Sequence, residues 1–458
     1  MNNTKQVLEC YVGLQWGDEG KGRLVDNSIE RAKLINPEKR IVVVRFQGGP
    51  NAGHTIYGTN LKGELAKFVT HAAPSGIVGN TDIAIGPDVA FDPEKFKREI
   101  DQGRELFGYN GRIMISERVG ILFDYHRKID GWREDNSERK IGTTRNGIGA
   151  FYEDNARRQT RITFRDYISD RFHDRLMAVL KLKLDELLTC VLEDRTLDNL
   201  CQELISVHDP IRKELTQFSE RLEYRLFEDY LNQGNHIIIE GAQGTMLDVN
   251  MGTIPDITSS HLLAPNAFSS LGLPRTMVKV IGVEKIYPTR VGEGIMPTEA
   301  KDEFGEIVAK IGDEIGATTG RKRRVGYPDW LIVKRSVLLN TCNEIIVTRA
   351  DVVQGLNLKV CTDYRFDGRT LREVPLDLSS VVPIYTSNYW WDLWGTEVEG
   401  NPLHLNQKIE DARAHYVETG IKGLPNDLIR YIADHDRYMG CPITGVGISP
   451  KGEIVSRK

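Results

Sequence analysis

The chain has 458 residues, of which 27% are charged and 40% hydrophobic, a composition typical of a globular protein with a packed core. Its net charge of −5 gives no global reason to expect binding to nucleic acid or to a membrane surface. No apolar run approaches the roughly 18 residues of a membrane helix, and the N-terminus lacks the pattern of a signal peptide. The six cysteines form no C-x-x-C pair and no zinc-type cluster, so we expect reduced thiols and a cytoplasmic location.

Short β-branched runs predict strands, and several of them precede a glycine-rich loop. They are VLECYVGL (7–14), IVVVRF (41–46), HIIIE (236–240), VKVIGV (278–283) and EIIVTRADV (344–352). Such apolar runs are typical of strands buried on both faces of a parallel sheet, which binds ligands outside its carboxyl ends. We therefore predict an α/β fold with a mostly parallel central sheet flanked by helices.

The middle of the chain predicts helices instead. No glycine occurs between Gly149 and Gly234, and apolar residues recur there at three- and four-residue steps. We expect core packing for one stripe of these residues: Leu176, Val179, Leu180, Leu184, Leu187, Leu188 and Val191. The pattern predicts a helical insertion at about 165–233 within one α/β domain over 1–458, with a smaller C-terminal α/β part at about 340–458.

Three tryptophans cluster near the C-terminus, at Trp390, Trp391 and Trp394. A packed subdomain surface is the favoured interpretation, and a contact with a partner or a second copy is the alternative.

The first glycine loop, GLQWGDEGKGR (13–23), follows a predicted strand and precedes a predicted helix. It is not a Walker A loop, because Gly22 stands where that motif needs serine or threonine. Its backbone N–H groups and Lys21 can still bind an anion. Asp18 fits such a loop if it binds a magnesium ion or takes a proton from a substrate. The alternative is an ordinary glycine turn with solvated acids.

The second glycine loop, QGGPNAGHT (47–55), carries Asn51 and His54 among three glycines. A histidine beside glycines that allow close approach can donate a hydrogen bond to a developing oxyanion. A structural histidine is the alternative.

Several sequence blocks together resemble the adenylosuccinate synthetase family, whose members join IMP and aspartate with GTP. QWGDEGKG and GGPNAGHT are followed in the family's order by DYHRKID, IGTTRNGIGAFYEDNARR, IEGAQGTMLDVNMGTIPDITSS, PTRVGEGIMPTE, GATTGRKRRVGYPD, VTRAD and CPITGVGISP. One block alone is a modest signal, but the ordered set spans nearly the whole chain.

The resemblance implies a two-step reaction. N1 of IMP is deprotonated, O6 attacks the γ-phosphate of GTP, and aspartate then displaces phosphate from 6-phosphoryl-IMP, as in other activated intermediates. Asp18 matches the family's base and magnesium ligand, and His54 matches the acid that assists the phosphate. Lys21 matches a phosphoryl-binding lysine, and the backbone carbonyl of Gly53 matches a second metal contact.

The resemblance also implies the binding residues. IMP contacts match Asn51, Thr144, Arg157, Gln243, Thr258 and Val291, with Arg158 as a second choice because the alignment there needs a one-residue gap. Arg157 matches an arginine that reaches IMP from a neighbouring subunit, which implies a homodimer. Aspartate contacts match Thr319, Arg321 and Arg323. GTP contacts match Gly17, Gly20, Lys21, Gly22, Gly53, His54, Thr55, Arg349, Asp351 and Pro450.

The chain departs from the family pattern at several of these positions. Lys322 interrupts the usual arginine run, Arg349 replaces a lysine, and the terminal GISP keeps only Pro450 of the usual Ser-Thr-Gly-Pro. Arg145-Asn146 stands where the family has Gly-Arg, an arginine that lies near the aspartate and IMP sites. Asn146 cannot supply that charge, whereas Arg145 could from one position earlier.

Three other functions compete with this hypothesis. A relative that aminates a guanine nucleotide such as dGMP is disfavoured, because those relatives replace the base aspartate with a small residue. A non-catalytic nucleotide-binding protein is disfavoured by the intact Asp18, Lys21 and His54. A P-loop GTPase switch is disfavoured by the failed Walker A pattern.

Overall fold

The computed structural model describes residues 8–315, 320–394, 407–449 and 454–457. Contacts divide the chain into two compact units. Unit 1 consists of residues 1–10, 25–242 and 258–278, and unit 2 of residues 11–24, 243–257 and 279–458. The domain limits predicted from the sequence stay predictions.

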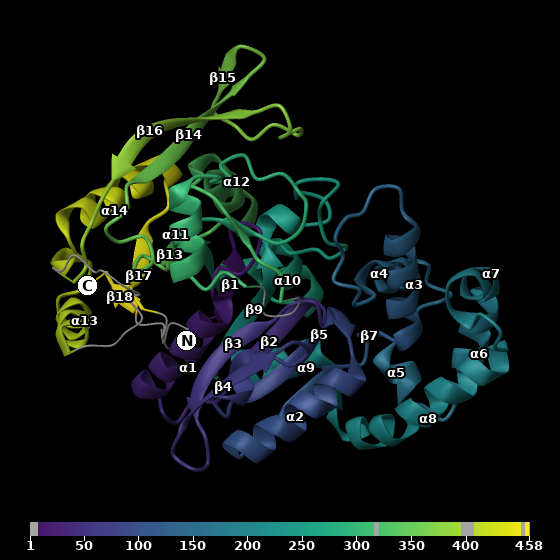
Figure 1. Ribbon diagram of the computed structural model, residues 1–458. Helices are drawn as coiled ribbons and strands as arrows, with labels where there is room; N and C mark the ends of the chain where they lie inside the picture. Colours follow the sequence, from purple (N-terminus) through teal and green to yellow (C-terminus); the bar gives the residue numbers. More distant parts are fainter. Residues whose placement is uncertain (1–7, 316–319, 395–406, 450–453, 458) are drawn as a thin grey trace. The chain divides into compact units, whose positions relative to one another are not determined.

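Unit 1 is built on parallel strands in the order β9-β2-β5-β6-β8, of which β9, β2 and β5 are labelled in Figure 1. Their bounds are His236–Gly244, Ile41–Gly48, Asp82–Phe91, Ile113–Ser116 and Ser219–Glu220. Val43 pairs with Ile238 on one side and with Ile83 on the other, and all eight residues of β2 are buried. The helices α2 (Pro93–Phe107) and α10 (Ala264–Leu271) and the hairpin of β3 (His54–Thr59) with β4 (Leu65–Thr70) also belong to unit 1.

The predicted helical segment contains α5 to α9, including the long helix α8. The bounds are Phe164–Tyr167 (α5), Phe172–Leu182 (α6), Leu184–Leu187 (α7), Leu197–Leu215 (α8) and Leu222–Arg225 (α9). Most of the predicted apolar stripe is buried, but the expectation was wrong for Leu184 and Leu188, which are 39% and 54% exposed. These two leucines lie four residues apart on one helix face, and that face is turned to solvent.

Unit 2 contains the parallel strands β10 (Val278–Lys285), β13 (Glu344–Thr348) and β17 (Ile443–Gly447), with β18 (Ile454–Ser456) antiparallel at the edge. The helices α11 (Glu303–Ile311), α12 (Trp330–Asn340), α13 (Gln407–Thr419) and α14 (Asn426–Met439) belong to it. A separate antiparallel sheet has the order β15-β14-β16, with bounds Arg369–Leu371, Leu358–Phe366 and Val382–Tyr389 (Figure 1).

The tryptophan cluster belongs to the core of unit 2. Trp391 and Trp394 are buried within it, and Trp391 Nε1 donates a hydrogen bond to the carbonyl of Ala350 at 3.0 Å. Trp390 is exposed. The packing interpretation is therefore confirmed for Trp391 and Trp394.

The predicted fold class is confirmed as mixed α/β with a mostly parallel sheet flanked by helices. Each predicted strand is present, and the first of them forms β1 (Leu8–Gly13), which contributes residues to both units. The helix expected after the first glycine loop is α1 (Lys21–Ile35). Among the described residues, no helix is both long enough and apolar enough to cross a membrane.

Candidate active site

The first glycine loop connects β1 to α1 and holds an unusual backbone. Gly17, Asp18 and Gly20 all have positive φ angles, of 93°, 62° and 95°. Glycine adopts this left-handed conformation readily, whereas other residues do so uncommonly, aspartate and asparagine more often than most. Gln243, also a predicted site residue, has φ of 60°, and its Cα lies 3.5 Å from where a Cβ on Gly17 would be.

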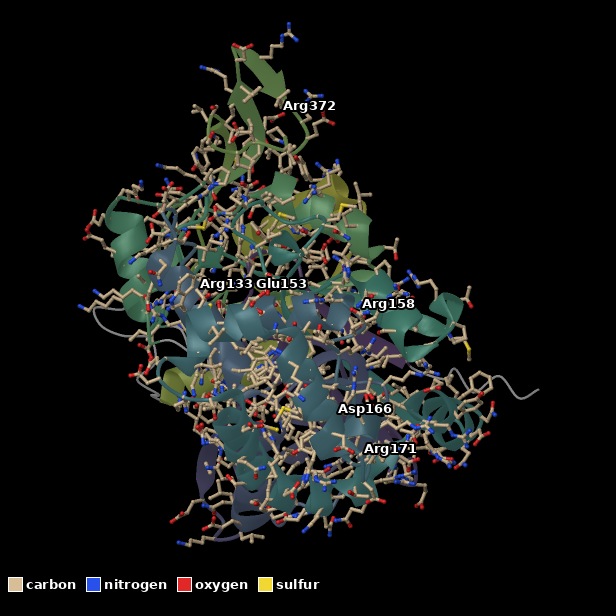
Figure 2. All side chains as sticks on the ribbon, turned by 90° about the vertical axis from the view of Figure 1, so that its right-hand side faces the viewer. Arg133, Glu153, Arg158, Asp166, Arg171 and Arg372 are labelled. Carbon is tan, nitrogen blue, oxygen red and sulfur yellow. The ribbon has the colours of Figure 1, made fainter. Side chains whose placement is uncertain are left out.

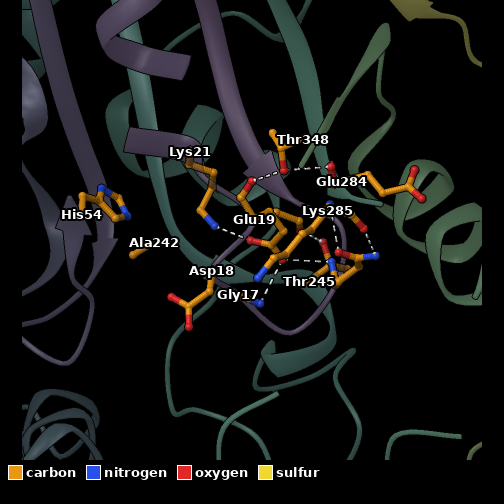
Figure 3. A network of polar contacts seen from close by, with 12 residues as sticks. Gly17, Asp18, Glu19, Lys21, His54, Ala242, Thr245, Glu284, Lys285 and Thr348 are labelled. Carbon is orange, nitrogen blue, oxygen red and sulfur yellow. Dashed lines mark hydrogen bonds and ion pairs between the residues drawn. The ribbon is translucent and has the colours of Figure 1, made fainter. Parts of the chain in front are cut away.

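Glu19 holds this loop in shape from inside (Figure 3). Its buried carboxylate accepts hydrogen bonds from the backbone N–H groups of Gln15 and Gly17, at 3.1 and 2.9 Å, and from Lys21 Nζ at 2.6 Å. A Cβ on Gly13 would lie only 2.3 Å from Glu19 Oε2, so glycine is needed there for the carboxylate to fit. No chemical role was predicted for Glu19 from the sequence. The feature that could have indicated its structural role is its position two residues before Lys21, which is itself predicted to be functional.

Asp18 and Arg323, which are 305 residues apart in the sequence, form an ion pair in unit 2. Arg323 Nε lies 2.6 Å from Asp18 Oδ2, and its NH1 lies 3.0 Å from Glu314 Oε2. Within the described residues Asp18 Oδ1 accepts no hydrogen bond. The predicted base and one of the predicted aspartate-binding arginines are thus in direct contact.

Glu314 is the centre of a buried charge cluster behind this pair. Its Oε1 accepts from Lys285 Nζ at 2.6 Å and from the Tyr287 hydroxyl at 2.7 Å. Burial alone would raise the pKa of Glu314, but the positive charges of Lys285, Arg349 and Arg323 lower it to about 2. Burial and the two guanidinium groups lower the pKa of Lys285 to about 8. Glu314 therefore faces three cations, of which Arg323 also pairs with Asp18 and Arg349 is also stabilised by Asp351.

Arg349, predicted to contact GTP, belongs to the same cluster. Its NH2 donates to the carbonyl of Gly312 at 2.5 Å and its Nε to the Tyr287 hydroxyl at 3.4 Å. Arg349 has φ of 69°, so it shares the left-handed backbone of Asp18 and Gln243. Burial opposes its charged form, but Tyr287, Asp351 and Glu314 outweigh this and raise its pKa. Asp351 itself is buried.

Of the remaining predicted residues of unit 2, two lie outside the described residues and the others lie within them. Thr319 and Pro450 lie outside the described residues. Arg321 is exposed, and Val291 is half-buried. The side-chain oxygen Oε1 of Gln243 is buried with no hydrogen-bond partner among the described residues. Burying an amide oxygen without a hydrogen-bond partner is energetically unfavourable.

In unit 1, His54 lies near the end of the second glycine loop, where β3 begins, and contacts Glu240 at the end of the apolar HIIIE run. His54 Nδ1 lies 2.5 Å from Glu240 Oε1. Glu240 also accepts hydrogen bonds from the backbone N–H of Ser75, at 2.8 Å, and from its hydroxyl. Burial would raise the pKa of Glu240, but His54 and the two Ser75 hydrogen bonds hold it below its ordinary value.

Two further buried charges, Arg45 and Glu99, bind backbone groups of the second glycine loop and of the segment that follows β4. Arg45, in the centre of β2, donates to the carbonyl of Gly49 at 2.9 Å and to the carbonyl of His71. Glu99 accepts from the backbone N–H groups of His71, Ala72 and Ala73. The sequence reasoning assigned no role to Arg45, Glu99 or Glu240. Arg45 and Glu240 had a readable signal, since each is a single charge in an otherwise apolar strand.

The other predicted residues of unit 1 lie in loops or at helix ends. Thr144 precedes α4 (Ile148–Ala156), and Arg157 is exposed at the end of that helix. Arg158 is exposed with φ of 30° (Figure 2). Arg133 of α3 (Asp124–Asn136) donates to both oxygens of Glu153 in α4, at 2.7 and 2.8 Å. The predicted residues Asn51, Gly53, Thr55 and Thr258 are half-buried.

The donor chemistry at Asp18 fits a magnesium ion. No group of three or more acidic, histidine or cysteine side chains forms a metal site in the described part of the chain. Mg²⁺ that travels with a nucleotide needs fewer protein ligands, because it takes one or two carboxylates together with phosphates and water. Asp18 offers a partly exposed carboxylate with one oxygen outside the Arg323 pair.

Comparisons with known proteins identify a family to which the chain is similar. The adenylosuccinate synthetase family model matches residues 10–455. The chain is 36% identical to the adenylosuccinate synthetase of Fusobacterium nucleatum over 452 residues, covering 96% of each chain. It is 39% identical to that of Carboxydothermus hydrogenoformans over 416 residues, covering 87% of this chain and 93% of the relative.

Two solved structures are also similar. The fully ligated adenylosuccinate synthetase of Plasmodium falciparum matches with a TM-score of 0.80 and 25% identity, over 98% of this chain and all of the other. The succinoaminodeoxyadenylate synthetase of cyanophage S-2L, bound to dGMP and dATP, matches with a TM-score of 0.57 over 97% of this chain and 93% of its own. At 18% identity the second likeness shows the fold alone. With the family model matched over nearly its whole length, the chain belongs to the adenylosuccinate synthetase family of ligases.

Proposed function

We propose that this protein ligates IMP and L-aspartate to adenylosuccinate, with conversion of GTP to GDP and phosphate. The observation that carries the proposal is Asp18, an acid at the centre of a glycine loop, held in a left-handed backbone and paired with Arg323 at 2.6 Å. A carboxylate in a phosphate-binding loop is unfavourable unless it performs chemistry, and the ligase reaction requires a base there.

In the first step, Asp18 takes the N1 proton of IMP, and O6 attacks the γ-phosphorus as the bond to the GDP oxygen breaks. Lys21 and the backbone N–H groups of the first glycine loop bind the transferred phosphoryl group. Lys21 is buried against Glu19, so its charge is fixed within the loop before the nucleotide arrives. Such preorganised charge needs little rearrangement during reaction.

In the second step, the aspartate amine attacks C6 and the C6–O bond breaks, so that phosphate leaves. His54 donates a hydrogen bond to that phosphate. Because Nδ1 of His54 is held by Glu240, Nε2 is the nitrogen that remains for the substrate. Glu240 thereby fixes both the orientation of the ring and its tautomer.

Magnesium is part of the proposal, with Asp18 and the backbone carbonyl of Gly53 as its protein ligands. When bound, it neutralises charge on the phosphates of the nucleotide. In this proposal Asp18 acts both as the base and as a metal ligand, so its ion pair with Arg323 weakens when the substrates bind.

The other substrates are assigned to residues of the charged loops. Thr319, Arg321 and Arg323 bind the carboxylates of aspartate, since a guanidinium pairs with a carboxylate through two parallel hydrogen bonds. Asp351 accepts hydrogen bonds from N1–H and N2–H₂ of guanine, a donor pair that adenine lacks, and Arg349 lies beside it. Asn51, Thr144, Gln243, Thr258 and Val291 contact IMP.

The proposed enzyme is a homodimer whose Arg157 reaches the IMP site of its partner subunit, in accord with its exposed position. Mixing an Asp18→Asn protein with an Arg157→Ala protein tests this, because a hybrid dimer regains one intact site. About a quarter of wild-type activity should return if subunits exchange at random. We assign the enzyme to the cytoplasm, since all six cysteines are free thiols, as expected in a reducing compartment.

The test of the activity is the absorbance rise at 280 nm that accompanies adenylosuccinate formation. The rise should require IMP, aspartate and GTP together, and should fall when GTP is replaced by ATP. Turnover of dGMP in place of IMP would overturn the substrate assignment. Hydrolysis of GTP without IMP and aspartate would overturn the ligase assignment.

A further inference from the structure

Lys95 is a half-buried cation in unit 1 that the proposed reaction has not yet used. It occupies the first turn of α2, where its backbone N–H donates to the capping residue Asp92 at 3.0 Å. Its Nζ lies 3.1 Å from Oδ1 of Asn146, and no described carboxylate forms an ion pair with it. An ammonium group has three donors, so two remain for a ligand.

The charged groups around Lys95 already have other partners. Asp92 caps α2 and pairs with Arg127, and Glu99 accepts three backbone N–H groups. Arg98 and Arg127 add positive charge nearby. Burial lowers the pKa of Lys95, so the charged form is held at a cost that an incoming anion would relieve.

Lys95 is linked to one predicted substrate loop of unit 1 through Asn146. Asn146, its hydrogen-bond partner, donates from Nδ2 to the carbonyl of Thr144, a predicted IMP contact, at 3.2 Å. His71, a neighbouring titratable group, bonds through Nδ1 to the carbonyl of Ala52 in the second glycine loop, at 2.8 Å. Burial lowers the pKa of His71, and the nearby charge of Lys95 contributes to this.

The resemblance implies an arginine at position 146, where this chain has Asn146, and Arg145 does not take that place. Arg145 is exposed, and its guanidinium pairs with Asp135 through both NH1 and NH2. A cation does reach Asn146 from α2 instead of from the loop itself, because Lys95 Nζ lies 3.1 Å from its Oδ1.

We propose that Lys95, positioned by Asn146, binds an anionic oxygen of a substrate and supplies the charge missing from position 146. This inference rests on the proposed ligase function. The oxygen belongs to a carboxylate of aspartate or to the phosphate of IMP. Either would accept a charge-assisted hydrogen bond from the ammonium group.

The experiment replaces Lys95 by methionine in the full-length protein and measures the KM of each substrate separately. Loss of one buried charge-assisted hydrogen bond should raise one KM by about 10- to 100-fold, whereas the KM for GTP stays within about twofold. A rise for aspartate identifies the carboxylate, and a rise for IMP identifies the phosphate. Lys95→Arg, which keeps the charge, should recover most of the loss.

Two further proteins make the result specific. Lys97→Met on the same helix is the matched control, because Lys97 pairs with Asp101 and Glu214 at 2.7 and 3.1 Å, away from the substrate loops. Its KM values should equal those of the wild type. Adding Asn146→Arg to Lys95→Met should regain about tenfold by restoring a cation at the loop.

The proposal is overturned if Lys95→Met leaves the KM for both aspartate and IMP unchanged while the wild-type protein is active. A wild-type protein without ligase activity would instead refute the proposed function. Calorimetric titration with IMP and with aspartate would then still decide the role of Lys95, because equal affinities in wild type and Lys95→Met would refute it independently.

Discussion

Replacing Glu314 by glutamine removes the carboxylate that contacts both Lys285 and Arg323 in the buried cluster of unit 2, while keeping the shape of the side chain. The carboxylate holds Lys285 at 2.6 Å, Tyr287 at 2.7 Å and Arg323 at 3.0 Å. A neutral amide leaves the buried ammonium of Lys285 without a counter-ion. We therefore expect the variant to be much less stable and to hold Arg323 less firmly.

The size of the effect follows from the burial of the pair. Breaking a buried ion pair by removing one partner typically costs about 3–5 kcal/mol. Unfolding of a chain of 458 residues has an entropy of about 1 kcal/mol per kelvin at its midpoint, so the melting temperature should fall by about 3–5 °C. Differential scanning calorimetry at neutral pH measures this shift directly.

The effect should depend on pH. The pKa of Glu314 is about 2 in the folded protein, below its ordinary value of 4.5. A depressed carboxyl pKa contributes stability that is complete above the unfolded value and is lost as the pH falls toward the folded one. The gap in melting temperature between wild type and Glu314→Gln should therefore narrow progressively below about pH 4.5.

A second substitution separates charge from packing. Glu314→Gln combined with Lys285→Met leaves no buried lysine unpaired, so it should melt above Glu314→Gln alone. A Glu314→Gln protein that melts within about 1 °C of wild type at neutral pH would refute the charge-balance argument.

Three substitutions test the remaining site residues. Asp18→Asn should lower kcat by about 10²–10⁴-fold with unchanged melting, because asparagine tolerates the left-handed backbone; steady-state turnover at the wild-type rate would exclude Asp18 as the base. Glu240→Gln should lower kcat by about 10²-fold with little change in any KM, because His54 loses its orientation; an unchanged kcat would show that His54 needs no such support. Glu19→Gln should raise the KM for GTP by about tenfold, because Lys21 and the glycine loop lose a charged anchor; an unchanged KM would contradict the anchoring role.

The sequence predicted the elements that local pattern controls. The run IVVVRF became a fully buried parallel strand, because β-branched residues without polar alternation suit a sheet covered on both faces. The same reasoning failed at Leu184 and Leu188, because periodicity identifies a helix face but not which face the rest of the protein covers.

What the sequence by itself determined was the residue chemistry and its order: the two glycine loops, Asp18, Lys21, His54 and the motifs that resemble one ligase family. Only the tertiary structure decided which charges meet. Asp18 contacts Arg323 and His54 contacts Glu240, although these partners are 305 and 186 residues apart in the chain. Contacts across such separations depend on how strands are ordered and packed, which local propensity does not encode. The roles of the buried Glu314 and Glu240 and of the half-buried Lys95 therefore depend on the groups that folding brings beside them.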